Sequence, residues 1–269
     1  GSQNTAVGMG ALKSNTTASS NTAVGYQAAY SNTTGTENTV VGGGALYTNT
    51  TGNYNLASGY LSMRLNTTGS KNVGLGYEAL RSNTTASDNT AVGFQSLHDN
   101  TTGTRNIAIG NTALNNNTTA SYNTALGFRG LFSNTTGASN VGLGYQALDA
   151  NTTGSSNVAI GRDALVYNTN ASNNTAVGYQ AGYTSNSGNG VTALGYQAMY
   201  SNTSGDATAM GYQAAYANTT GTAVSAFGYQ ALDANTTGNY NTGIGGLALS
   251  ANTTASYNTA VGYQAQYSG

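Results

Sequence analysis

A glycine recurs at a nearly fixed distance along this chain of 269 residues. Sixteen segments similar to N-T-A-V-G end in that glycine, and successive glycines are 17 residues apart except for one 16-residue step between Gly195 and Gly211. A short, constant period is typical of a solenoid, in which each repeat forms one coil and stacks on the next. We number each repeat from the Asn of N-T-A-V-G as position 1, so that the glycine is position 5.

Positions 2 to 4 carry the pattern of a short strand. Position 4 is apolar in every repeat except at Ser58, position 2 is Thr or an apolar residue in nearly all, and position 3 is small. Side chains alternate between faces along a strand, so positions 2 and 4 share a face. The Y-Q-A-L segment at positions 6 to 9 predicts a second strand, and N-T-T followed by Gly or Ala at positions 12 to 15 predicts a turn. A disordered chain has no reason to keep this register.

Stacking of the coils makes further predictions about packing. Position 5 needs Gly, either for a positive φ or for close contact with the next coil. Where position 9 is small, as at Ala29 and Gly182, position 10 is Tyr, which indicates that the two positions share a packed space. At position 17, Lys71, Asp88 and Arg105 lie on successive coils, so opposite charges are expected to be neighbours.

These patterns predict an all-β fold, a parallel β-solenoid (β-roll) of about sixteen 17-residue coils that spans 1–269 as a single repeat domain. Neither end shows the atypical sequence of a capping repeat, so we expect a segment of a longer fibrous chain. Each coil is expected to bury one Val, one Leu, one Ala and part of a Tyr. Because this core is thin, we expect a symmetric homo-oligomer of three chains that bury apolar surface against each other.

The composition excludes several classes of function. Only 6% of the residues are charged and the net charge is -1, so we expect no binding to nucleic acid. No apolar run is long enough for insertion into a membrane. There is no Cys, and His98 is the one histidine, expected on a solvated edge. The eight carboxylates are scattered over the repeats, so no catalytic residue, metal site or cofactor is predicted.

A row of glycosylation acceptor sequences follows the predicted N-T-T turns. One interpretation is structural, with Asn folding onto the turn backbone and its amides hydrogen-bonding from coil to coil. The other is a sugar-coated edge, carried by these Asn or by the neighbouring Thr hydroxyls. The candidate acceptors are Asn15, Asn32, Asn49, Asn66, Asn83, Asn100, Asn117, Asn134, Asn151, Asn202, Asn218, Asn235 and Asn252.

Position 6 forms an aromatic ladder. Its side chains could stack on the sugar rings of a glycan, or they could pack inside the solenoid or between chains, which the exchange of Tyr for Phe favours. Thr rows also raise the alternative of an ice-binding face, against which stands the exchange of Thr for Val and Ile at position 2. The ladder comprises Tyr26, Tyr60, Tyr77, Phe94, Phe128, Tyr145, Tyr179, Tyr196, Tyr212, Tyr229 and Tyr263.

The segments Asn106-Ile107-Ala108-Ile109-Gly110 and Asn157-Val158-Ala159-Ile160-Gly161 resemble the repeats of YadA-like heads of trimeric autotransporter adhesins. The N-T-A-V-G-Y-Q-A-L arrays also resemble repetitive regions of phage tail fibres. The resemblance implies a left-handed parallel β-roll and a trimer. It also implies an extracellular, non-enzymatic fibre or adhesin segment on a cell surface or virion, with a host surface or glycan as partner.

Overall fold

The computed structural model describes residues 1–186, 188–203 and 206–267 and divides into two compact units, Gly1–Ala138 and Ser139–Gly269. All secondary structure in these residues is β. Unit 1 contains β1 (Thr5–Val7), β2 (Thr22–Val24), β3 (Thr39–Val41), β4 (Leu56–Ser58), β5 (Val73–Leu75), β6 (Thr90–Val92), β7 (Ile107–Ile109) and β8 (Thr124–Leu126). Unit 2 contains β9 (Val141–Leu143), β10 (Val158–Ile160), β11 (Thr175–Val177), β12 (Thr192–Leu194), β13 (Ala207–Met210), β14 (Val224–Phe227), β15 (Thr242–Ile244) and β16 (Thr259–Val261).

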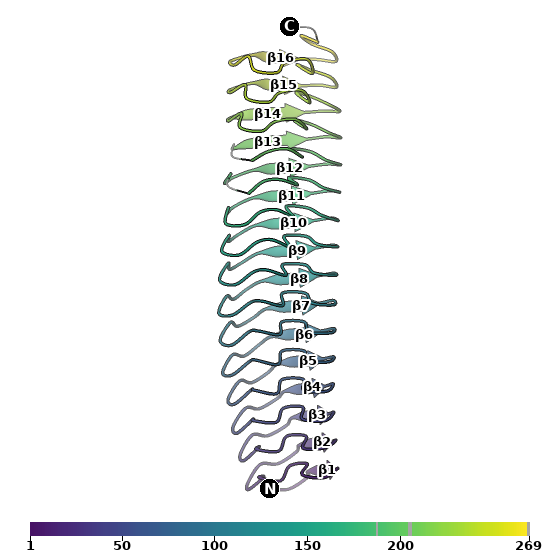
Figure 1. The fold of residues 1–269 in the computed structure, drawn as a ribbon, viewed down its shortest axis with the longest axis vertical. Coiled ribbons are helices and arrows are strands. Elements are labelled where there is room, and N and C mark those ends of the chain that lie inside the picture. Colours follow the sequence, from purple (N-terminus) through teal and green to yellow (C-terminus); the bar gives the residue numbers. More distant parts are fainter. Residues whose placement is uncertain (187, 204–205, 268–269) are drawn as a thin grey trace. The chain divides into compact units, whose positions relative to one another are not determined.

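In each unit the strands pair in parallel with the strand of the next coil (Figure 1). Equivalent repeat positions lie over one another, as in Thr22 opposite Thr39 and Val158 opposite Thr175. The 16-residue repeat keeps this register, because Thr192 pairs with Thr208. The missing residue therefore lies between Asn202 and Thr208 in the sequence, because Asn202 and Asn218 still occupy equivalent positions. The prediction of a parallel β-solenoid is confirmed.

The glycine at position 5 has both properties that the sequence predicted. Gly59 has a φ of 138°, and a Cβ placed on it would lie 2.2 Å from the carbonyl oxygen of Gly76 in the next coil. Side chains other than hydrogen would be strained at this φ and would also strike the neighbouring backbone. Gly is thus required by the dihedral angle and by the spacing of the coils together.

The second predicted strand is wrong. The Y-Q-A-L segment forms a turn, in which positions 7 and 9 adopt a positive φ, for example 55° at Gln27 and 50° at Leu97. Each coil therefore has one strand. The turn is held by backbone hydrogen bonds to the neighbouring coils, such as Leu97 N–H to Ala113 C=O at 2.9 Å. Such left-handed conformations persist for non-glycine residues only where the surroundings hold them.

The interior of a coil is made of small side chains. Position 3 of the strand, such as Ala91, points inward and is fully buried, as are the Ala at position 8 and the Leu at position 9. The expected burial of the position-4 Val within the coil is wrong, because positions 2 and 4 point outward. The expected volume compensation within one coil is not found at Gly182. At Gly182 the space is taken by Leu165 of the preceding coil, whose Cδ2 lies 2.8 Å from the place of a Cβ, while Tyr183 is partly exposed.

Candidate functional site

Two columns of asparagine run through the interior and meet at one carbonyl in each coil of unit 1. In the coil of β4, Nδ2 of Asn55 (position 1) and Nδ2 of Asn66 (position 12) both donate to the Gly69 carbonyl, each at 2.9 Å. Asn66 Nδ2 also donates to Oδ1 of Asn49 at 2.8 Å. The side chains at position 12 therefore satisfy one another from coil to coil, as the structural interpretation of the N-T-T sequences predicted.

The predicted glycan acceptors belong to this position-12 column. All of them are buried except Asn15 and Asn252, which are partly exposed. The amide nitrogen that would carry the sugar is engaged in the column, so attachment to the folded chain would break two hydrogen bonds and displace the next coil. The Thr hydroxyls at position 13 are engaged too, as in Thr67 Oγ1 donating to the Thr84 carbonyl at 3.0 Å. The Thr at position 14, such as Thr68, is exposed. Glycosylation stays a prediction, and in the folded chain this geometry opposes it at the asparagines and at the position-13 hydroxyls.

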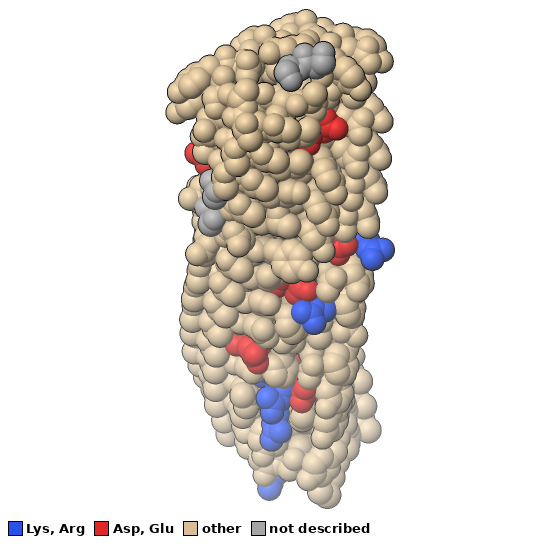
Figure 2. All heavy atoms as spheres, turned by 45° about the horizontal axis from the view of Figure 1, so that its top comes forward, with Lys and Arg blue, Asp and Glu red and all other residues tan. Residues whose placement is uncertain are grey.

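The outward side chains at positions 2 and 4 form what we call the strand face. Position 4 is exposed or half-buried throughout, with exposed fractions of 42% at Val41, 47% at Leu126 and 37% at Ile160. No charged residue occupies position 2 or 4 in any of the sixteen repeats. Charged side chains are also sparse on the surface seen in Figure 2. Each unit thus presents a charge-free row of Thr and aliphatic side chains along its strands.

The aromatic ladder at position 6, which we call the tyrosine column, lies on the outside. Tyr26 and Tyr60 are each 55% exposed, so packing in the interior of the chain is wrong. Neighbouring rings stack along the column, as in Tyr77 and Phe94 with centroids 5.2 Å apart and Tyr196 and Tyr212 at 5.0 Å. Stacked faces are shared between neighbours, while the ring edges and hydroxyls face solvent.

A second aromatic column, at position 10, was not predicted. Tyr183 and Tyr200 stack at 4.7 Å, and Tyr200 and Tyr216 at 5.1 Å. A hydrogen bond with Tyr167 and burial raise the pKa of Tyr183 to about 12. The recurrence of Tyr at position 10 was the signal in the sequence, but it was interpreted as compensation for small residues at position 9.

The few charged residues make local contacts. The Glu78 carboxylate lies 3.4 Å from Arg81 Nε and 3.6 Å from His98 Nε2, and it accepts a hydrogen bond from Gln95 Nε2 at 2.8 Å. The other ring nitrogen of His98, Nδ1, lies 2.6 Å from Asp99 Oδ1. The expected solvated edge at His98 is therefore a partly buried polar cluster. The expected neighbours Lys71 and Asp88 form no ion pair among the described residues. Arg105 contacts Tyr122 of the next coil instead.

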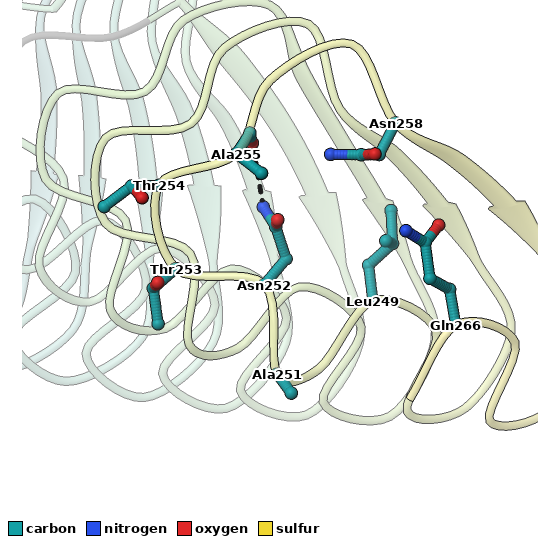
Figure 3. A pocket seen from close by; sticks show the side chains of 8 residues that line it. All are labelled: Leu249, Ala251, Asn252, Thr253, Thr254, Ala255, Asn258 and Gln266. Carbon is teal, nitrogen blue, oxygen red and sulfur yellow. Dashed lines mark hydrogen bonds between the residues drawn. The ribbon is translucent and has the colours of Figure 1, made fainter. Parts of the chain in front are cut away.

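Figure 3 shows a hollow of about 190 Å³ over the last described coil, between Leu249, Asn252 and Gln266. The dashed bond in that view joins Asn252 Nδ2 to the Ala255 carbonyl at 3.1 Å. Leu249 and Asn252 belong to the same columns that fill the interior of the other coils. The lining of the hollow therefore does not differ from that of the solenoid interior.

Neither a metal centre nor a membrane-spanning helix occurs in the described parts of the chain. No three His, Cys, Asp or Glu side chains come together there in a group that could bind a metal ion. Within the same residues no helix has the length and apolar character needed to cross a bilayer.

The described residues thus present outward columns of Thr, aliphatic and aromatic side chains. No protein-family model matches the sequence, and the curated proteins contain no significant match to it.

Proposed function

We propose that the chain is a non-enzymatic, extracellular structural fibre segment that assembles from several copies through the strand face. The observation that carries this proposal is the exposure of that face, where aliphatic side chains such as Leu126 and Ile244 are 47% and 42% exposed. A row of outward apolar residues of this kind marks an interaction surface. Two identical charge-free faces meet without burying an unpaired charge, so a second copy of the chain suits the surface.

The resemblance to trimeric adhesin heads makes three the expected number of chains. Three solenoids with their strand faces turned to a common axis would bury positions 2 and 4 and leave the tyrosine columns outside. The position-4 residues would then supply the large apolar side chains that the Ala-lined interior of each coil lacks. A cell-surface or virion fibre that spaces or presents adhesive ends is the role that such an assembly serves.

Mass measurement in solution tests this proposal. The intact chain should sediment as about three times 27.0 kDa at micromolar concentration. Leu126→Lys should weaken association by about a hundredfold, because a lysine would be buried without a partner in every copy. Leu65→Lys is the matched control, since Leu65 is 38% exposed outside the strand face, and it should leave the mass unchanged. A parent chain that is folded and monomeric would refute the assembly.

Ice binding is a second candidate, favoured by one observation. The position-2 Thr side chains point outward, although their exchange for Val and Ile indicated burial, and Thr175, Thr192 and Thr208 follow one another on adjacent strands of unit 2. Regular spacing of about 4.8 Å between coils gives such a row a lattice-like repeat. Inhibition of ice recrystallisation at micromolar protein, lost in Thr192→Lys, would favour this candidate over assembly.

A further inference from the structure

The tyrosine column is interrupted in unit 1 by a glycine. Gly43 occupies position 6 between Tyr26 and Tyr60, which lie two coils apart and therefore about 9.6 Å from each other. Consecutive rings elsewhere in the column stack at 5.0 to 5.8 Å, as Tyr196 with Tyr212 and Tyr60 with Tyr77 do. The interval between Tyr26 and Tyr60 thus has the thickness of one further ring.

A hollow of about 140 Å³ lies at this interruption. A cavity of about 150 Å³ in another protein holds one benzene molecule, so this hollow has about the volume of one unsubstituted six-membered ring. Position 7 contributes Gln27 and Leu61 to the walls, and position 10 contributes Tyr47 and Arg64. The hollow therefore combines ring faces with an amide and a guanidinium group.

Arg64 gives the hollow its charge. Its guanidinium carbon lies 5.6 Å from the centroid of the Tyr47 ring, and no carboxylate of the described residues pairs with it. Glu78, one coil further on, is occupied by Arg81 and Gln95. An arginine held against an aromatic face with its donors free is suited to bidentate binding of a carboxylate.

We propose that this hollow binds a six-membered ring that carries a carboxylate, of the hexuronic acid class, as found in acidic polysaccharides. The ring inserts between Tyr26 and Tyr60 and takes the place of the missing side chain. Its carboxylate pairs with Arg64, and the Gln27 amide serves the ring hydroxyls. This site goes beyond the proposed assembly, because it uses positions 6, 7 and 10 and leaves the strand face free.

Unit 2 contains a matched interruption with different chemistry. Gly246 stands at position 6 between Tyr229 and Tyr263, and the adjoining hollow is lined by Gln230, Asp233, Leu247, Ser250, Ala251 and Tyr267. An acidic side chain replaces the arginine there. A ring with a carboxylate should therefore be rejected by this second hollow, which makes Gly246 an internal control.

Saturation-transfer NMR on the intact chain with glucuronate, glucose and benzoate tests the proposal. Glucuronate should receive saturation, glucose about tenfold less for want of the ion pair, and benzoate less than glucuronate for want of hydroxyl contacts. Gly43→Tyr restores the column and should abolish the glucuronate signal. The φ of Gly43 is not positive, and a Cβ there would lie 3.4 Å from Tyr60 Cδ2, so the variant is expected to fold.

Two further variants make the outcome decisive. Arg64→Gln should remove the preference for glucuronate over glucose while the chain stays folded, and Gly246→Tyr should leave the glucuronate signal as it is. Absence of any saturation in the parent chain, an undiminished signal in Gly43→Tyr, or equal signals from glucuronate and glucose would each overturn the proposal. Sedimentation of the same samples measures the number of chains in the assembly, so failure of ring binding can be told apart from failure of the proposed assembly.

Discussion

The two units differ in how they fill position 1. In unit 1 this position is Asn in all eight coils, whereas in unit 2 three consecutive coils carry Val191, Ala207 and Val224. Where the preceding coil has Asn at position 1, the N–H of position 1 donates to its Oδ1, as Asn55 does to Asn38 at 2.9 Å, and the strand begins at position 2. In β13 and β14, the strand begins one residue earlier and Ala207 pairs with Val224. The asparagine side chain and the strand ladder thus compete for one backbone group.

Position 12 of unit 2 shows the opposite case, a single replacement. Ser185 interrupts the column, and Asn168 Oδ1 and Ser185 Oγ are buried without hydrogen-bond partners. The neighbouring asparagine loses a donor that the shorter serine cannot supply. Replacing a run of polar residues together leaves few orphaned groups, while replacing one leaves its neighbours unpaired.

A single replacement in the intact column of unit 1 should have the largest effect. Asn66→Ala removes the bonds to Asn49 Oδ1 and the Gly69 carbonyl, and it takes an acceptor from Asn83 Nδ2. We expect a loss of about 2 to 4 kcal/mol in the free energy of unfolding, measured by urea denaturation. Thr68→Ala, in the exposed corner next to it, is the control and should cost less than about 0.5 kcal/mol. Equal losses in the two variants would contradict the role of the column.

Replacement of a run should cost less per residue than replacement of one. In Asn55→Val the backbone N–H of residue 55 still donates to Asn38 Oδ1. The backbone N–H of Asn72, however, loses its acceptor, the Oδ1 of Asn55. We expect about 1 to 3 kcal/mol for the single variant and less than three times that value for Asn38, Asn55 and Asn72 replaced together. Solution NMR should show the strands of the triple variant lengthened by one residue. Additive losses in the free energy of unfolding, with strands of unchanged length, would contradict the competition between the asparagine side chain and the strand ladder.

The sequence alone predicted the solenoid, its register and the two roles of the position-5 glycine, because each depends on the period and on one residue type. It did not predict which face of the strand is inward. Alternation shows only that positions 2 and 4 differ from position 3, and an apolar Val or Leu is ordinarily placed inside. Here two asparagine columns occupy the narrow interior beside Leu97 and its equivalents, which leaves room in the strand for Ala91 alone.

The turn at Y-Q-A-L could not be predicted for a related reason. Leu and Gln have no preference for a positive φ, so nothing in the residues at Leu97 or Gln27 indicates one. Backbone hydrogen bonds to neighbouring coils impose these angles. The hollow at Gly43 was visible in the sequence only as a gap in the tyrosine column, and its volume and the free guanidinium of Arg64 required the structure.

Filling the defect in unit 2 should stabilise it. Ser185→Asn supplies an amide that can donate to Asn168 Oδ1 and thereby continue the position-12 column. We expect a gain of about 1 kcal/mol, or about 2 to 4 °C in the melting temperature followed by circular dichroism. Ser185→Ala, which removes only the unpaired hydroxyl, should change stability by less. A melting temperature for Ser185→Asn at or below that of the parent chain would show that the column cannot be continued there.

The smallest effect concerns Asp233, a further orphan of unit 2 whose Oδ1 is buried without a partner. Burial raises the pKa of this carboxyl above 3.8, so the folded chain holds the proton more tightly than the unfolded chain. The resulting stability is present below the unfolded pKa and is lost as the pH rises through the folded pKa. Asp233→Asn should therefore melt no more than about 2 °C above the parent at pH 7, since the side chain is only half-buried, and the difference should shrink below about pH 4. Asp149→Asn is the matched control, because Asp149 occupies the same repeat position in another coil. Its carboxylate accepts a hydrogen bond from Gln146 Nε2 at 3.1 Å, so this variant should melt no higher than the parent chain. A difference for Asp233→Asn that stayed constant from pH 7 to about pH 3 would mean that the cost at this position does not come from its charge.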